Sequence, residues 1–135
     1  MRRIETSGAP LPAGHYSQGV IHRGVVYVAG QLALDPETRA VVEGGAYEQT
    51  VRTMRNVEAV LVAAGSSLAE LLSVTVYVTD HAYWADVNRA FADVMGTHRP
   101  ARAIVPVPAL RAGCLVEIQG TAVTSASDSP DVPDA

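Results

Sequence analysis

The stretch LSVTVYVT, residues 72–79, is the clearest strand in this chain, and the fold prediction is built around it. Apolar and polar side chains alternate along it with a period of two, which is typical of a strand with one buried face. The apolar set is Leu72, Val74, Val76 and Val78. Segments with helical periodicity lie before and after this strand, so helix and strand alternate along the middle of the chain.

The segment before the strand, Ala46 to Ala64, is predicted to be an amphipathic helix. Its apolar residues recur at spacings of three and four, and Gly65 follows as a C′ cap. The sequence SLAE at 67–70 has the form of a capping box and is expected to begin a short turn. The helical stripe consists of Tyr47, Val51, Met54, Val57 and Leu61.

The segment after the strand is predicted to be a second helix. It begins between Asp80 and Ala82 and runs to Gly96, again with helical spacing of its apolar residues. This stripe consists of Trp84, Val87, Phe91 and Val94.

Further strands are predicted at both ends of the chain. Residues 16–29 form two strands broken at the hairpin turn His22-Arg23-Gly24, and the second of them ends at Gly30. Val41 and Val42 are expected to form a short strand ahead of the first helix.

The two final strands are expected at 103–107 and 114–123. Pro106 and Pro108 cannot donate hydrogen bonds to a ladder, so that part of the first of these strands is expected at an edge or a bulge.

This order of elements predicts an α+β fold, an α/β sandwich with a mixed sheet of five or six strands. Two helices can cover only one face of such a sheet, so the second face needs another cover. The run Val25 to Val28 lacks polar alternation, and self-association is therefore expected to bury the second face. A single domain is expected over residues 1–124, followed by a disordered tail at 125–135.

Composition places the chain among ordinary globular proteins. It has 135 residues, 48% of them hydrophobic and 18% charged, and its net charge of -4 argues against nucleic acid as a partner. No apolar run approaches the roughly 20 residues that span a bilayer, so we expect no membrane association and a cytoplasmic location. Cys114 is the single cysteine, and the four histidines lack ligand spacing, which argues against a metal site.

The chemistry-bearing residues of interest are Arg102, at the head of an apolar strand, and Glu117, between Val116 and Ile118. A partly buried guanidinium usually meets an anion. That anion is either Glu117, in a salt bridge that only stabilises the sheet, or a bound ligand. The residues alone favour neither interpretation over the other. A hairpin between the last strands could bring the two near one pocket. If Val116 and Ile118 face the helices, Glu117 faces the opposite side.

Several short motifs, taken together and in order, resemble the Rid family (RidA, also called YjgF). Each is weak alone, but their order and spacing from about Ile4 to Ala122 are specific. They are AP at 9–10, GHYSQG at 14–19, VAGQ at 28–31, QT at 49–50, NV at 56–57, VYVTD at 76–80, VN at 87–88, RPAR at 99–102 and VEI at 116–118.

The resemblance implies a homotrimer of the chorismate-mutase type, with clefts between subunits and no cofactor. It implies that Arg102 binds a substrate carboxylate and that Glu117 positions the attacking water. By the same resemblance Tyr16 and Asn88 line or support the cleft. Ala29 stands where many members have serine, and Ile104 stands where the best known members have cysteine. The substrate-binding set implied is Tyr16, Ala29, Gly30, Asn88, Arg102 and Ile104.

The leading hypothesis is hydrolysis of 2-imino acids and their enamines to 2-oxo acids and ammonia. The alternatives are a non-catalytic protein that binds a small carboxylate metabolite, and a pathway-specific deaminase that acts on a different enamine or a cyclic imine. A role as an endoribonuclease is disfavoured by the negative net charge.

Overall fold

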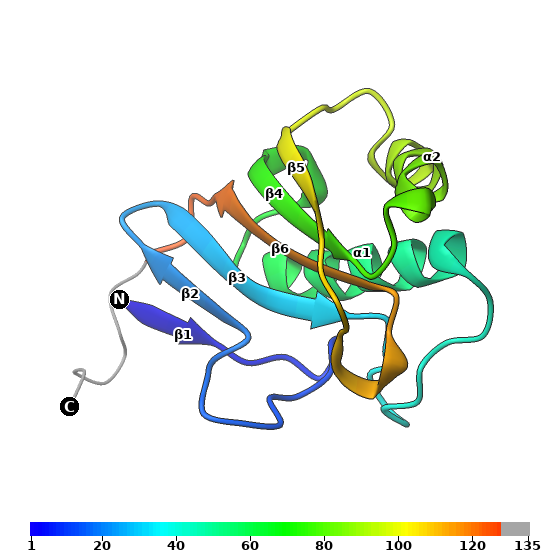
Figure 1. Cartoon of the computed structure of the whole chain (residues 1–135). Coiled ribbons are helices and arrows are strands. Elements are labelled where there is room, and N and C mark those ends of the chain that lie inside the picture. The colour runs from blue at the N-terminus through cyan, green and yellow to red at the C-terminus, as the bar shows by residue number, and fades with distance from the viewer. Residues whose placement is uncertain (128–135) are drawn as a thin grey trace.

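A computed structural model describes residues 1–127 of the chain. Six strands form one mixed sheet in the order β1-β2-β3-β6-β4-β5 (Figure 1). All neighbouring strands are antiparallel except β4 and β5, which are parallel. The strands are β1 (Arg2–Ile4), β2 (Gly19–His22), β3 (Val25–Leu32), β4 (Leu71–Val78), β5 (Ala101–Pro106) and β6 (Val116–Val123).

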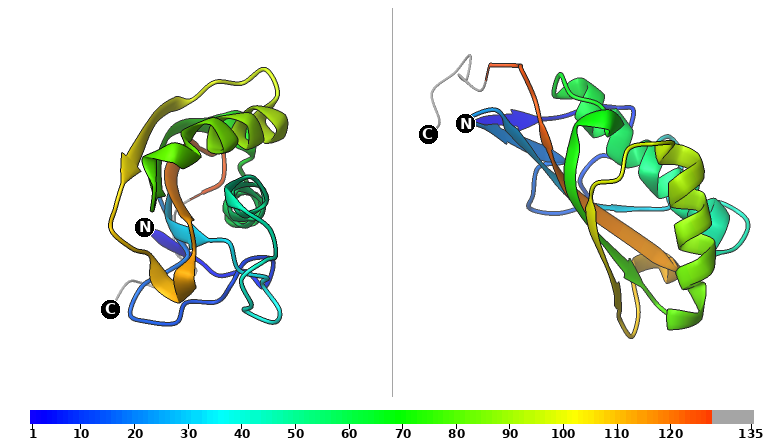
Figure 2. Two further views of the ribbon diagram at one scale, coloured as in Figure 1. Left: turned by 45° about the vertical axis from the view of Figure 1, so that its right-hand side comes forward. Right: turned by 90° about the horizontal axis from the view of Figure 1, so that it is seen from above.

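Two helices, α1 (Ala46–Ala63) and α2 (Trp84–Met95), pack on the same face of this sheet (Figure 2). The predicted stripe of α1 is confirmed for Met54, Val57 and Leu61, which are fully buried, whereas Tyr47 and Val51 are only half-buried. The helix ends as expected, with Gly65 at a φ of 71° and the N–H of Ser66 donating to the carbonyl of Leu61. The predicted mixed sheet with both helices on one face is therefore confirmed.

Strand β4 follows the predicted alternation except at its start. Val74, Val76 and Val78 are buried, but Leu72 is 50% exposed and Leu71 takes the core position instead. The pairing of β4 with β6 shifts register between Leu71 and Ser73, and this shift turns Leu72 outward. The prediction that Leu72 shares the buried face is wrong for this reason.

The predicted hairpin of β2 and β3 is confirmed. Its two-residue turn, Arg23 and Gly24, has positive φ at both positions, the conformation that matches the twist of paired strands. β3 continues past Ala29 to Leu32 across a register shift between Val28 and Gln31, so the strand does not end at Gly30.

Other elements differ from expectation in detail. Strand β1 had no sequence signal, and the expected strand at 41–42 is a single bridge between Leu34 and Val41. Ser67 makes no side-chain cap bond, so the predicted capping box is wrong, although Leu68–Glu70 does form a short 3₁₀ turn. Asp80 accepts a hydrogen bond from the N–H of Ala82 and starts the turn that leads into α2.

The last two strands are not a hairpin. α2 forms a crossover connection that places β5 parallel to β4, and β4 therefore lies between β5 and β6. The expectation of a hairpin between the final strands is wrong, whereas the edge position expected from the prolines is confirmed, since β5 is the outermost strand and ends at Pro106.

The second face of the sheet carries no α-helix among the described residues (Figure 2). Its side chains are polar or partly exposed, including Tyr27, Ser73, Gln119 and Thr121. We call this side the open face. Burial of the open face by self-association stays a prediction, and most of the tail predicted at 125–135 lies outside the described residues. Within residues 1–127 no helix is long and apolar enough to cross a membrane.

Candidate functional site

Arg102 projects from β5 toward α2, on the face of the sheet that the helices cover. It pairs in register with Val74, which is buried in the core. Its Nη2 donates to Oδ1 of Asn88 at 3.0 Å, and its Cζ lies 5.0 Å from the ring centroid of Phe91 and 5.9 Å from that of Trp84. One helix therefore supplies an amide and two aromatic rings that fix the guanidinium.

Most donors of Arg102 are open. Among residues 1–127 its only hydrogen bond is the one to Asn88, and no carboxylate forms an ion pair with it. A guanidinium has five N–H donors, so at least one edge of the fork can bind a planar anion. Burial lowers the pKa of Arg102, but a guanidinium stays charged at physiological pH.

A cavity of about 490 Å³ lies beside this arginine. Its lining contains Arg99 as a second positive charge and no aspartate or glutamate from the described part of the chain. His98 also lines it, with Nε2 held at 2.7 Å from the carbonyl of Leu71. The cavity is therefore electropositive and suited to a small carboxylate. We call it the arginine half-site, defined by Asn88, Phe91, Arg99 and Arg102.

Glu117 lies on the opposite side of the sheet. Its neighbours Val116 and Ile118 are fully buried toward the helices, so Glu117 points to the open face, beside Tyr77 of β4 and Leu32 of β3. The predicted orientation of this side chain is confirmed. Burial raises the pKa of the carboxyl, and within residues 1–127 it has no hydrogen bond or ion pair.

Gly30 makes room for this carboxylate. A Cβ built on Gly30 would lie 2.9 Å from Oε2 and 3.1 Å from Cδ of Glu117, closer than side chains tolerate. Around them a hollow of about 270 Å³ is lined by Tyr16, Ala29, Gly30, Leu32, Arg111 and Glu117. We call this hollow the glutamate half-site.

The structure thus separates the expected site residues into two groups. Arg102, Asn88 and Ile104 belong to the helix-covered side, with Ile104 paired to buried Val76. Tyr16, Ala29, Gly30 and Glu117 belong to the open face. A salt bridge between Arg102 and Glu117 is therefore wrong for a single chain, because the sheet stands between the two side chains.

Two contributors to the site were missed from the sequence. Arg111 lines the glutamate half-site from the turn before β6, and nothing in its neighbours signals that this turn reaches Tyr16. Gln18 is buried and holds residues 6–10 in place, with Nε2 donating to the carbonyl of Pro10 at 2.8 Å and Oε1 accepting from the N–H of Thr6 at 2.7 Å. It supports the loop that carries Tyr16, and its place in GHYSQG is the only sequence signal.

The described part of the chain contains no cluster of residues that could bind a metal ion. No three His, Cys, Asp or Glu side chains of residues 1–127 are placed to hold an ion.

The chain is similar in sequence to known proteins of one family. The family model described as Endoribonuclease L-PSP matches residues 6–124. A RutC family protein of Pyrococcus abyssi is 40% identical over 119 residues, which is 88% of this chain and 94% of that protein. The rat protein named 2-iminobutanoate/2-iminopropanoate deaminase is 35% identical over 120 residues, 89% of this chain and 88% of that protein.

Solved structures agree with this. RidA from an Antarctic Psychrobacter has a TM-score of 0.87 at 37% identity, and the match covers 91% of this chain and 99% of that one. Escherichia coli TdcF, solved with bound serine, has a TM-score of 0.88 at 32% identity, covering 93% of this chain and 100% of that one.

Proposed function

The chain belongs to the endoribonuclease L-PSP family, which is the family of the RidA proteins, and on this premise we propose that it hydrolyses reactive imines and enamines. The substrates are 2-imino acids, and the products are 2-oxo acids and ammonia. The rat relative named as a 2-iminobutanoate/2-iminopropanoate deaminase supports this reaction, and the serine-bound TdcF structure supports a small ligand with a carboxylate.

The observation that carries the proposal is the open guanidinium of Arg102 in the arginine half-site. A 2-imino acid has its carboxylate next to the electrophilic C=N carbon. One bidentate contact therefore fixes the reacting carbon as well as the charge, which supplies much of the positioning that a small substrate needs.

A complete site needs two copies of the chain. Within one copy Arg102 and Glu117 lie on opposite sides of the sheet. The Arg102 of one copy is proposed to meet the Glu117 of a neighbour whose open face it helps to cover. The homotrimer implied by the family resemblance gives such an arrangement three times.

Glu117 is proposed to act on the attacking water. Its carboxylate accepts a proton from water as the oxygen bonds to the imine carbon, and it passes that proton to the imine nitrogen as the C=N double bond becomes a single bond. In the resulting tetrahedral carbinolamine the carboxylate takes the hydroxyl proton and delivers it to the amine, and ammonia leaves as the C–N bond breaks and the C=O bond forms. The raised pKa of Glu117 makes the carboxylate a better proton acceptor near neutral pH than an ordinary glutamate.

Ala29 and Ile104 offer no side-chain donor to the intermediate. β5 is an edge strand, so some of its peptide N–H groups near Ile104 face away from β4. These backbone groups are the donors proposed to stabilise the tetrahedral intermediate.

The test couples the purified protein to a threonine dehydratase, which releases 2-aminocrotonate from threonine. We expect faster formation of 2-oxobutanoate with the protein present, and loss of this acceleration in Arg102→Ala. Arg102→Lys retains the charge without the planar fork and serves as the second variant. Arg55→Ala, on the exposed side of α1, is the matched control. No acceleration by the wild type with imines derived from several amino acids would overturn the proposal.

A second candidate is a binding protein without turnover. The apolar side chains of Ala29 and Ile104 favour it, because they remove two polar groups from the proposed site. Binding of 2-oxobutanoate by calorimetry together with no hydrolysis of any imine would identify this function. Turnover of larger or cyclic imines alone would identify a pathway-specific deaminase.

A further inference from the structure

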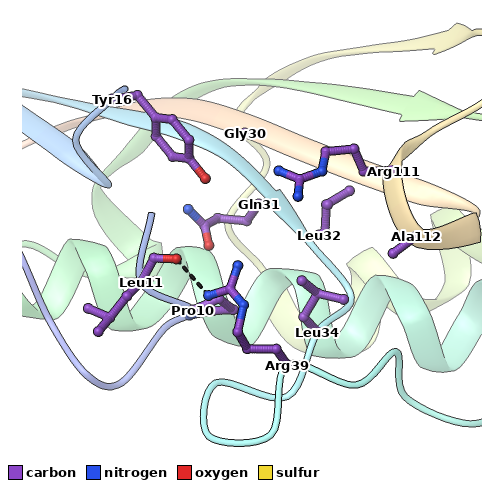
Figure 3. Close-up of a pocket in the computed structure, with 10 residues that line it drawn as sticks. All are labelled: Pro10, Leu11, Tyr16, Gly30, Gln31, Leu32, Leu34, Arg39, Arg111 and Ala112. Carbon is purple, nitrogen blue, oxygen red and sulfur yellow. Dashed lines mark hydrogen bonds between the residues drawn. The ribbon is translucent and has the colours of Figure 1, made fainter. Parts of the chain in front are cut away.

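Arg111 is a positive charge on the open face, on the other side of the sheet from Arg102. Figure 3 shows its guanidinium directed toward Gly30 and Gln31, on the same side as the hydroxyl of Tyr16. No hydrogen bond or ion pair from residues 1–127 engages the guanidinium of Arg111. It also lines the glutamate half-site beside Glu117.

The backbone that carries Arg111 is a fixed turn rather than an open loop. Ala112 and Gly113 both have positive φ, at 57° and 71°, and the N–H of Cys114 donates to the carbonyl of Arg111 at 3.0 Å. Cys114 is buried and anchors the end of the turn. The guanidinium is therefore presented from a defined position.

A cavity of about 60 Å³ lies next to Arg111, and it has a second guanidinium, that of Arg39. Arg39 is held by a hydrogen bond from Nη1 to the carbonyl of Leu11 at 2.7 Å (Figure 3). The residues that line this cavity include no aspartate or glutamate from the described chain. Two guanidinium groups without a carboxylate form a site for an anion. This volume is several times what a single water molecule needs, so a carboxylate group fits.

Arg111 does not neutralise Glu117. No nitrogen of Arg111 lies within the ion-pair distance of 4.0 Å from that carboxylate in the described structure. The pKa of Glu117 is raised by burial, which is the opposite of what a close guanidinium produces. The charge of Arg111 is thus available to a ligand that already lies over Glu117.

We propose that Arg111 binds a second anionic group of the substrate and selects 2-imino acids with an acidic side chain. The inference rests on the proposed function. Arg102 of one copy holds the 2-carboxylate, Glu117 of its neighbour handles the water, and the substrate side chain extends from there toward Arg111. Dicarboxylic 2-imino acids are the chemical class that satisfies both arginines.

The test compares two imines produced in the assay by amino-acid oxidases, 2-iminoglutarate from glutamate and 2-iminopropanoate from alanine. The quantity is the ratio of their kcat/KM values. We expect the wild type to favour 2-iminoglutarate, and Arg111→Ala to lower the ratio by at least about ten-fold, because a charge-assisted bidentate contact is lost. Arg111→Lys restores part of the ratio, and the control Arg55→Ala keeps the wild-type ratio.

Two results would overturn the inference while the proposed function stands. One is an unchanged ratio in Arg111→Ala. The other is a smaller assembly of this variant by light scattering, which would make Arg111 an interface residue.

If the wild type hydrolyses neither imine, the proposed function fails and calorimetry decides the inference. Preference for 2-oxoglutarate over 2-oxobutanoate that is lost in Arg111→Ala supports it, and absence of that preference overturns it.

Discussion

The carboxylate of Glu117 occupies the space beside Gly30 where a side chain would stand, so that a Cβ at residue 30 would lie 2.9 Å from Oε2. Gly30→Ala is therefore expected to push the carboxylate away while the exposed backbone of residue 30 keeps its fold. We expect kcat/KM to fall about ten- to hundred-fold with little change in Tm. Gly45→Ala is the control, since the nearest atom to its added Cβ is 3.9 Å away. Equal activity of both variants would contradict a role for the Glu117 position.

The pH dependence of the reaction reports on Glu117. Burial raises the pKa of its carboxyl, and the proposed mechanism needs the ionised form. The acid limb of the kcat/KM profile is therefore expected at a higher pH than the ordinary glutamate value of about 4.3. An acid limb at or below that value, measured with a stable protein, would exclude Glu117 as the proton acceptor.

The raised pKa of Glu117 also affects the stability of the fold. A carboxyl whose pKa is higher in the folded than in the unfolded protein destabilises the fold once it ionises, and this penalty disappears as pH falls below the unfolded value. Glu117→Gln is expected to be at least as stable as the wild type at pH 7, with the difference shrinking toward pH 4. Chemical denaturation at both pH values measures it. A Glu117→Gln protein that is less stable at pH 7 would contradict this assignment.

Mixing two inactive variants tests whether the two half-sites come from different copies. Arg102→Ala and Glu117→Gln each lose one group, but a mixed assembly contains some sites with an intact arginine from one copy and an intact glutamate from the other. With random assembly after co-expression, about a quarter of the wild-type activity is expected. The two variants expressed apart and mixed without exchange of copies are the control. No recovery in co-expressed protein would place both groups in one chain.

Asn56 is expected to be the most costly polar side chain to remove from α1. It is fully buried, and its Nδ2 donates to the carbonyls of Leu32 and Leu34, both at 2.9 Å. Asn56→Ala leaves these acceptors without a partner, which is expected to lower the free energy of unfolding by about 2–4 kcal/mol. Arg55→Ala removes an exposed ion pair and is expected to change it by less than about 1 kcal/mol. Urea denaturation compares the two, and equal losses would contradict the assignment.

The elements were predictable where one periodicity was strong. The stripe of α1 and the alternation of β4 each identified a buried face, because helical and strand spacing place side chains without reference to the rest of the fold. The prediction that Leu72 is buried was wrong because a shift in the pairing of β4 with β6 turns this side chain outward. Such a shift leaves no signal in the local sequence. β1 has only three residues, too few for a pattern.

The sequence suggested candidate residues for the site, and those stay predictions, but it could not give their arrangement. The motifs named Arg102, Glu117, Tyr16 and Asn88, and the neighbours Val116 and Ile118 gave the correct face for Glu117. Arg102 and Glu117 lie on opposite sides of the sheet, and this relationship depends on the order of β5, β4 and β6. That order follows from the α2 crossover, a tertiary property that neither strand carries in its own sequence.

The two outer strands also determine how copies of this chain can meet. β1 is three residues long and includes Arg2 and Arg3, while β5 ends at Pro106, which has no N–H to offer a further strand. Both edges are poor templates for the endless strand-by-strand growth that leads to fibres. The broad open face is the surface through which we expect copies to associate, and contacts through a face can close on themselves. The features that stop the sheet at its edges thus favour a finite particle over a polymer.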